Sequence, residues 1–242
     1  MHVVAKTDIG HKRDENQDRV KFCALADNVT MAVLCDGMGG QNAGSEASEL
    51  AVNIIYERIV AGYRPDSDFN SIRNLLISAV CAANAVIFDV AEKDSRKVGM
   101  GTTCVAVLTD KNMAHFVNVG DSRAYILGKD SIIQVTSDHT VVRFLYEQGQ
   151  INENEIKSHP QRNYITKAVG VSLKVEPDYF EVELEPAARV LLCSDGLSNY
   201  CSDEEISKIV QYSDLNQAAD RLIQLALANG GSDNITLALI GD

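Results

Sequence analysis

The stretch VLCDGMGG, residues 33–40, ends an apolar run in one acidic residue and three glycines. Together with the preceding Met31 and Ala32, its first three residues have the composition of a buried strand. Glycine allows the backbone to turn sharply and leaves room beside Asp36 for a ligand or a carbonyl group. Asp-Gly is also a common turn dipeptide, so this stretch alone predicts a strand followed by a turn.

Four further aspartates stand where a strand-like run meets a loop, a place where a rigid scaffold can aim a side chain. They are Asp18 in RDENQD, Asp121 in NVGDSR, Asp195 in SDGL and Asp233 in SDNIT. Any one of them is more often a turn residue than a ligand, but five in such positions form a distinctive set. Carboxylates brought together without Cys or His make an oxygen-rich site that suits Mg²⁺ or Mn²⁺ better than zinc.

The hydrophobic periodicity between these acids predicts an α+β fold. Apolar residues recur at helical spacing over 45–61, where Ser45 can cap the first turn, and over about 68–93. Strand-like runs follow at 102–108, 114–119, 123–127 and 132–135. Their connections are too short for parallel crossovers, so the sheet is predicted to be antiparallel.

The second half of the chain repeats this mixture of elements. The elements predicted there are a short helix near 138–148, a polar irregular stretch over 149–163, strands near 178–185 and 189–194, a helix with a capping box at 202–205, a second helix ending at 229–231, and a last strand over 234–240. Helix pairs around antiparallel strands indicate α+β layers.

Composition limits the function classes. The chain has 242 residues, 45% of them hydrophobic, and predicts a single domain over 1–242 with one sizeable core. No apolar run approaches the roughly 18 residues that cross a bilayer, and no signal peptide is visible, so we expect a cytoplasmic protein without a membrane partner. The net charge of −12 argues against nucleic acid as a partner. If the substrate is an anion, bound metal cations are a candidate source of positive charge.

The six cysteines form no C-x-x-C pair, and most lie inside apolar runs. This pattern favours reduced cysteines that act as small core residues of a cytosolic protein over zinc ligands or disulfides.

The ordered set of motifs resembles the metal-dependent type 2C protein Ser/Thr phosphatases, the PPM family, in their compact bacterial form. The likeness runs from TDIG at 7–10 to DNIT at 233–236 and includes GMGTT at 99–103, HPQRN at 159–163 and ITKAVG at 165–170. The resemblance implies an α-β-β-α sandwich of two antiparallel sheets flanked by helix pairs. It also implies a mobile flap over about 145–168 that influences substrate choice, in which Arg162 and Asn163 are candidates to contact the phosphoprotein.

The same resemblance implies a binuclear Mn²⁺ or Mg²⁺ centre at one end of the sandwich. Carried onto this sequence, Asp36 bridges two metals, the Gly37 carbonyl binds one of them, and Asp195 and Asp233 hold the other. Asp121, with Asp195, would form the weaker third site of bacterial relatives. We therefore expect two metal ions per chain, with room for a third.

The activity implied by the resemblance is hydrolysis of phosphoserine and phosphothreonine on proteins by a hydroxide that bridges the metals. Asp18 would orient metal-bound water, and Arg13 would grip the substrate phosphate through its planar fork. Because no phosphoenzyme is required, no nucleophilic Cys or Ser is expected. The implied partners are phosphorylated proteins, including a eukaryotic-like Ser/Thr kinase that the enzyme opposes, and we expect a monomer.

Three positions depart from the family pattern. Gln17 stands where some members, chiefly eukaryotic, carry Glu; Met38 stands where those members carry a His proposed as general acid; and Gln41 replaces a His of bacterial relatives. The acid for the leaving group is therefore unassigned. Metal-bound water, His139 and His159 are the options, although an ordinary structural role is favoured for each histidine.

Two other functions stay open. One is a pseudophosphatase, a non-catalytic module that binds phosphoproteins, which the presence of Arg13 and all the expected aspartates disfavours. The other is a regulator phosphatase that acts on an anti-sigma antagonist, which the lack of an attached sensor or membrane segment disfavours.

Overall fold

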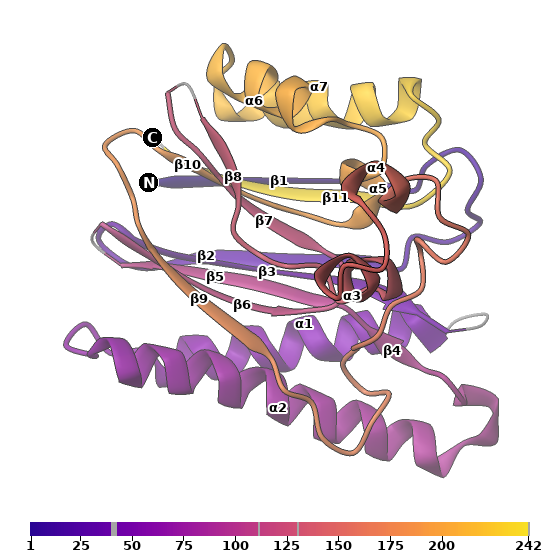
Figure 1. The fold of residues 1–242 in the computed structure, drawn as a ribbon. Coiled ribbons are helices and arrows are strands. Elements are labelled where there is room, and N and C mark those ends of the chain that lie inside the picture. Colours follow the sequence, from indigo (N-terminus) through magenta and orange to yellow (C-terminus); the bar gives the residue numbers. More distant parts are fainter. Residues whose placement is uncertain (40–42, 111, 130, 242) are drawn as a thin grey trace.

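The computed structural model describes residues 1–39, 43–110, 112–129 and 131–241, and it confirms the predicted α+β sandwich. Two antiparallel sheets lie face to face between two layers of helices (Figure 1). Gln41, singled out above, lies outside the described residues.

One sheet has the strand order β1-β11-β10-β7-β8 and the other has the order β2-β3-β5-β6-β9, with β4 pairing at the end of β3. The strands of the first sheet are β1 (His2–Asp8), β11 (Ile235–Gly241), β10 (Arg189–Cys193), β7 (Arg123–Leu127) and β8 (Ile132–Gln134). The strands of the second sheet are β2 (Asp18–Ala26), β3 (Val29–Met38), β5 (Cys104–Asp110), β6 (Met113–Val119), β9 (Asp178–Glu183) and β4 (Gly101–Thr102).

Long helices cover the outer face of each sheet, as Figure 1 shows. The helices α1 (Ala43–Gly62) and α2 (Phe69–Lys93) cover the second sheet, and α6 (Asp203–Gln211) and α7 (Leu215–Ala228) cover the first. Shorter helices lie in the connections: η1 (Ser95–Lys97), α3 (Val141–Glu147), α4 (Glu153–Ile156) and α5 (Asp195–Ser198).

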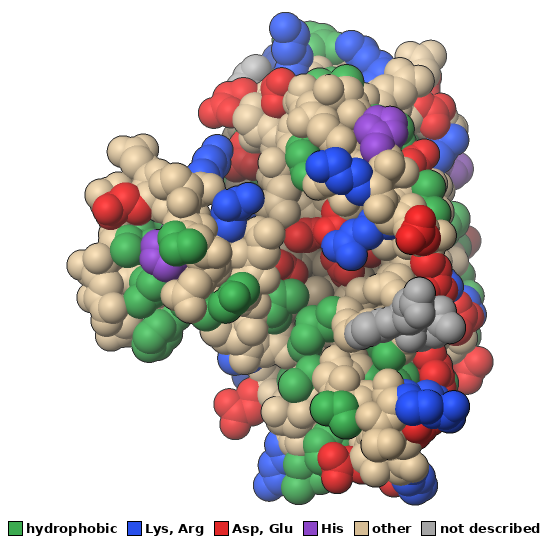
Figure 2. Space-filling view, turned by 90° about the vertical axis from the view of Figure 1, so that its right-hand side faces the viewer, with side chains coloured by type: hydrophobic (Ala, Val, Ile, Leu, Met, Phe, Trp, Pro, Cys, Tyr) green, Lys and Arg blue, Asp and Glu red, His purple; other side chains and the backbone are tan. Residues whose placement is uncertain are grey.

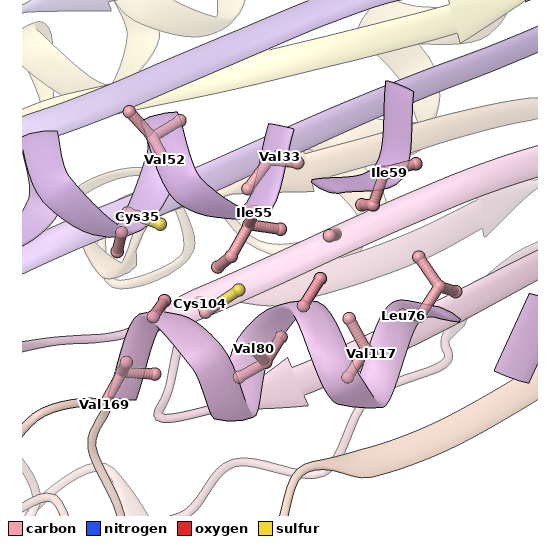
Figure 3. Packing of buried hydrophobic residues seen from close by; sticks show 14 of the residues in the cluster. Val33, Cys35, Val52, Ile55, Ile59, Leu76, Val80, Cys104, Val117 and Val169 are labelled. Atoms are coloured by element: carbon pink, nitrogen blue, oxygen red, sulfur yellow. The ribbon is translucent and has the colours of Figure 1, made fainter. Parts of the chain in front are cut away.

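Three apolar layers hold the sandwich together. Alternate residues of β3 explain them, because side chains along a strand point to opposite faces. Val33 and Cys35 pack with Ile55 of α1 and Val80 of α2 (Figure 3), whereas Leu34 faces the other sheet. A third cluster lies under α6 and α7. Because both faces of the inner strands are covered, strands such as β5 and β11 are buried along their whole length.

Several predicted element ends are confirmed and one is wrong. Asp68 caps α2, and Ser202 with Glu205 forms the predicted capping box of α6. Ser45, however, lies inside α1, which begins at Ala43, and its hydroxyl accepts a hydrogen bond from Arg19 Nη2 at 2.8 Å. The polar stretch 149–163 also contains a short helix, α4, which the sequence did not predict.

By length and composition alone, the helix α2 is long and apolar enough to cross a membrane. The sequence pattern had predicted no such segment. Its buried residues, such as Ile72, Leu76 and Ile87, belong to the cluster shared with α1 and the second sheet. A core helix of a globular protein passes the same test, and the packing of α2 accounts for its composition.

All six cysteines are free, and four of them, Cys35, Cys104, Cys193 and Cys201, are buried in the apolar clusters. The prediction that cysteines serve as small core residues is therefore confirmed for these four.

Candidate metal centre

The strand registers bring the predicted site aspartates to one end of the sandwich. Asp18 begins β2 directly opposite Asp36 in β3, while Asp195 follows β10 and Asp233 precedes β11 in the other sheet. Ser194 joins the two sheets, because its hydroxyl donates to Asp18 Oδ2 at 2.8 Å in a buried contact. Figure 2 shows acidic side chains gathered in a hollow on this end of the molecule, with basic side chains beside them.

The backbone around Asp36 is fixed by two threonines. Asp36 lies within β3 rather than after it, at the point where the strand changes partner from β5 to β4. Its carbonyl oxygen accepts hydrogen bonds from the Thr103 amide and the Thr102 hydroxyl, both at 2.8 Å, and its own amide donates to Thr103 Oγ1. A Cβ atom at Gly37 would lie 2.1 Å from the carbonyl oxygen of Gly44, so only glycine fits there.

Burial and mutual repulsion perturb the carboxyl groups of this cluster. Burial raises the pKa of Asp36 well above its usual value, and the charges of Asp18 and Asp195 raise it further. Burial followed by repulsion from Asp121 likewise raises the pKa of Asp195. For Asp18, burial raises the pKa to about 6 against the stabilising hydrogen bond from Ser194. These carboxylates share a small volume without enough positive charge to neutralise them.

Asp121 follows β6 in the turn to β7, and burial raises the pKa of its carboxyl to about 6, with repulsion from Asp138 as the next cause. Its charge also raises the pKa of Asp36 and of Asp195. The structure thus brings Asp121 into the same electrostatic cluster, as the prediction of a third site requires.

Two carboxylate oxygens of the cluster are buried without any hydrogen-bond partner, namely Asp18 Oδ1 and Asp195 Oδ1. A buried polar atom left unsatisfied costs about 1–3 kcal/mol, and more when it is charged. An all-oxygen donor set with excess negative charge is what Mg²⁺ and Mn²⁺ prefer. The residues therefore fit such ions in donor type and charge, although no group of three or more His, Cys, Asp or Glu among the described residues is arranged to hold a metal as it stands.

One acid of the cluster, Asp233, is paired with Arg13. Arg13 Nη2 donates to Asp233 Oδ2 at 2.7 Å, and the Asp233 Oδ1 atom accepts from the Asn234 amide. This hydrogen bond is the largest cause of the raised pKa of Arg13. Both side chains are partly exposed, and an exposed ion pair contributes only about 0–1 kcal/mol. The ion pair is therefore weak enough for Arg13 and Asp233 to separate when each is offered a stronger binding partner.

Two residues that the sequence did not indicate as part of the site, Asn234 and Arg19, hold the backbone around Asp18. Asn234 accepts a hydrogen bond from the Gln17 amide and donates to the carbonyls of Ile9 and Glu15. Arg19 Nη1 donates to the carbonyl of Asp18 at 2.8 Å. The sequence signal for Asn234 was its place beside Asp233 in SDN, whereas the contact of Arg19 depends on the tertiary fold.

His139 supports the turn that carries Asp121. Its Nδ1 atom accepts from the Gly120 amide at 3.0 Å, and its Nε2 atom lies 3.1 Å from Asp178 Oδ2. Burial lowers the pKa of this imidazole. Both ring nitrogens of His139 are thus engaged in contacts that hold this turn, and its structural role stays a prediction.

The predicted flap projects beside the acidic hollow. Its base is fastened by hydrogen bonds from the Val141 amide to the Tyr164 carbonyl and from the Thr166 amide to the His139 carbonyl, both at 2.8 Å. The lobe around α4 stands out at the left of Figure 2. His159 lies in this segment, where its Nδ1 atom accepts from a backbone amide of its own turn. The mobility of the flap stays a prediction.

Comparisons with known proteins agree with this arrangement. A family model described as Protein phosphatase 2C matches residues 10–238. The chain belongs to the protein phosphatase 2C family. It is therefore a protein Ser/Thr phosphatase, as the motifs predicted.

Relatives in this family match the chain over nearly its whole length. A putative protein phosphatase 2C-type of Streptococcus pyogenes is 38% identical over 242 residues, which cover 99% of this chain and 97% of the relative. The serine/threonine phosphatase stp of Listeria monocytogenes is 35% identical over 244 residues, which cover 99% and 95%.

Solved phosphatase structures superpose closely on this fold. The serine/threonine phosphatase Stp1 from Staphylococcus aureus has a TM-score of 0.93 at 37% identity, covering 99% of this chain and 94% of Stp1. The catalytic domain of the phosphatase PstP, in complex with two manganese ions, has a TM-score of 0.85 at 34% identity, covering 98% and 96%. The predicted two-sheet sandwich is thereby confirmed.

Proposed function

We propose that this phosphatase requires Mn²⁺ or Mg²⁺ and that the five converging aspartates hold these ions. Asp36 and the Gly37 carbonyl would hold two ions between them, Asp195 and Asp233 would bind one of these, and Asp121 would contribute to a third site. The observation that carries the proposal is the set of crowded, buried carboxylates with two oxygens that have no partner. The two manganese ions of the related PstP structure support the count of two.

When bound, such cations make water a stronger nucleophile at neutral pH and neutralise charge on the phosphoryl oxygens. The protein supplies the remaining steps. Asp18 would orient the attacking water through its Oδ1, which has no hydrogen-bond partner among the described residues, while Ser194 holds its Oδ2. Arg13, released from Asp233, offers its planar fork to two oxygens of the substrate phosphate.

Neither Met38 nor His139 is suited to give the proton to the leaving serine or threonine oxygen. Met38 has no acidic proton, and both nitrogens of His139 are engaged by Gly120 and Asp178. Of the two histidines, only His159, which lies outside the acidic hollow in the flap segment, retains an uncommitted ring nitrogen among the contacts of the described residues. A water held in the cluster is therefore the favoured proton source.

The substrates are phosphorylated proteins, and we propose that they include a Ser/Thr kinase and its targets. The named phosphatases among the relatives support this substrate class. We further propose that the protein works in the cytoplasm as a monomer, a location in which six free cysteines are stable.

The test is phosphate release from a phosphothreonine peptide with Mn²⁺, with Mg²⁺ and after exhaustive chelation. We expect activity only with metal, and we expect Asp36→Asn to lose at least about a thousandfold in turnover. The matched control is Asp66→Asn, an exposed acid in the loop at the far end of α1, which should keep wild-type turnover. Activity that survives chelation, or an Asp36→Asn variant with full turnover, would contradict the proposal.

A further inference from the structure

The segments that precede Thr102 and follow Val169 display large apolar side chains to solvent, and Thr102 itself donates a hydrogen bond to the Asp36 carbonyl. Val98 is 79% exposed, Leu173 is 71% exposed and Val171 is 45% exposed. The segments 98–101 and 169–173 contain no charged residue. Exposed apolar side chains on neighbouring loops are a feature of surfaces that bind other chains.

The loops are held in place by backbone pairing and by one buried asparagine. Thr102 and Val169 exchange hydrogen bonds of 3.0 and 2.8 Å, so the two segments leave this bridge side by side. Asn84 of α2 donates to the Ser172 carbonyl at 2.9 Å and accepts from the Gly170 amide at 2.8 Å. Because hydrogen bonds anchor both segments to the core, their apolar side chains stay exposed to solvent instead of folding back onto the protein.

Val171 and Met38 link these segments to the strand that carries Asp36, because both side chains lie close to Gly101. A Cβ atom at Gly101 would lie 2.6 Å from Val171 Cγ2 and 3.7 Å from Met38 Cε. Met38 is two residues beyond Asp36 at the end of β3, where it pairs with Gly101. We call the four side chains Met38, Val98, Val171 and Leu173 the apolar ledge.

A phosphorylated serine or threonine enters a phosphatase as part of a polypeptide, so its neighbours in sequence must contact the surface around the site. We propose that the apolar ledge binds a large apolar side chain of the substrate that flanks the phosphorylated residue, and thereby selects among phosphoproteins. This inference rests on the proposed position of the reaction at Asp36. An apolar side chain gains by leaving water at the ledge, whereas a charged one would lose part of its hydration there.

The test measures kcat/KM of the Mn²⁺-loaded protein on phosphothreonine peptides in which each flanking position carries leucine, serine or aspartate in turn. We expect leucine to be preferred over aspartate by roughly tenfold at one or two positions on one side of the phosphothreonine. The double variant Val98→Ser, Leu173→Ser should reduce that preference to about twofold or less. Hydrolysis of p-nitrophenyl phosphate, which has no flanking residues, should stay at the wild-type rate.

The matched control is Tyr212→Ser, which removes a side chain that is also 79% exposed. Tyr212 ends α6 near Arg189, at the start of β10, whereas the candidate centre lies beyond the end of that strand. We expect this control to keep the peptide preference.

A wild-type protein that hydrolyses p-nitrophenyl phosphate but shows no preference at any flanking position would overturn the role of the ledge and leave the metal centre intact. A preference that survives the double variant, or one that Tyr212→Ser abolishes equally, would also overturn it. So would a ledge that instead joins two copies of the chain, seen as a mass that doubles with concentration in the wild type alone.

Discussion

Two neighbouring regions of the molecule differ in how far their buried or partly buried charged side chains are neutralised by partners. Arg123, at the start of β7, makes a two-pronged ion pair with Asp138: its Nη2 donates to Oδ2 at 2.6 Å and its Nε to Oδ1 at 2.9 Å. Gln134 donates a further hydrogen bond to the same carboxylate. Burial opposes the charge of Arg123, but Asp138 and Tyr125 hold the pKa of the guanidinium well above its usual value.

Of the carboxylates of the candidate metal centre, only that of Asp233 forms an ion pair, with Arg13, among the described residues. Asp195 accepts one hydrogen bond from Asn199 and leaves Oδ1 unsatisfied, and burial followed by repulsion from four surrounding acids raises the pKa of Asp36. The fold thus pairs the charge of Arg123 with that of Asp138, and leaves most aspartates of the candidate metal centre without a cationic partner. The difference indicates that the first region serves stability and the second serves the binding of cations.

The largest effect is expected at the neutralised region. Replacing Asp138 with alanine leaves the largely buried Arg123 guanidinium without its carboxylate and should lower the free energy of unfolding by about 3 kcal/mol, the low end of the range for a buried pair. Urea denaturation of metal-stripped wild type and variant measures the change. A loss below about 1 kcal/mol would show that Arg123 does not depend on Asp138 for neutralisation, and would contradict the stabilising role of this pair.

The next largest effect is expected in the pH dependence of the free energy of unfolding of the metal-free protein. In the metal-free protein the pKa of Asp18 and of Asp121 is about 6, above the ordinary aspartate value of the unfolded chain. Between about pH 4 and pH 6 the folded state keeps protons that the unfolded chain has released, so the free energy of unfolding should fall as pH rises, by the order of a few kcal/mol. Urea denaturation across this window, compared with Asp18→Asn, measures the slope. A slope that is equal in both proteins would contradict the assignment to Asp18.

An opposite change is expected when one unneutralised acid is removed. Asp195→Asn eliminates a repelling charge and keeps an oxygen that can accept from Asn199, so the metal-free variant should gain about 1–3 kcal/mol in unfolding free energy. Saturating Mn²⁺ should stabilise the wild type and not this variant. Destabilisation of the metal-free variant would show that the charge of Asp195 is already compensated within the fold.

The smallest effect concerns Asp178, which fixes the ring of His139 and through it the Gly120 amide. Asp178→Asn should weaken Mn²⁺ binding at the site that includes Asp121 by about tenfold, because partners of this kind orient a ligand without touching the metal. Titration calorimetry with Mn²⁺ measures the affinity, and Lys167→Met, which removes the other partner of Asp178, serves as the control. An unchanged Mn²⁺ affinity in Asp178→Asn would show that Asp178 and His139 do not position Asp121 for metal binding.

Local sequence patterns were enough to predict much of the fold. The strands of the β5 to β8 region and the capping box at Ser202 follow from alternation, short connections and side-chain chemistry within a few residues. Errors arose where tertiary contacts decide the outcome. Ser45 was predicted to cap a helix, but Arg19 from β2 binds its hydroxyl inside α1.

The candidate site was predictable in its residue types and not in its connections. The strand-end positions of the aspartates, together with the family motifs, indicated which acids converge. The pairing of Arg13 with Asp233, the bond from Ser194 to Asp18 and the support of Gly120 by His139 join segments far apart in sequence. No local pattern encodes these contacts, because they depend on how the two sheets are stacked.

The most direct test of the central claim is the number of manganese ions bound per chain, measured by equilibrium dialysis and elemental analysis on wild type and Asp36→Asn. If Asp36 is the carboxylate shared by both ions, the wild type should retain about two ions and the variant fewer than about one. Circular dichroism of both proteins would verify that the variant is folded. An Asp36→Asn protein that is folded and binds as much manganese as the wild type would contradict the account.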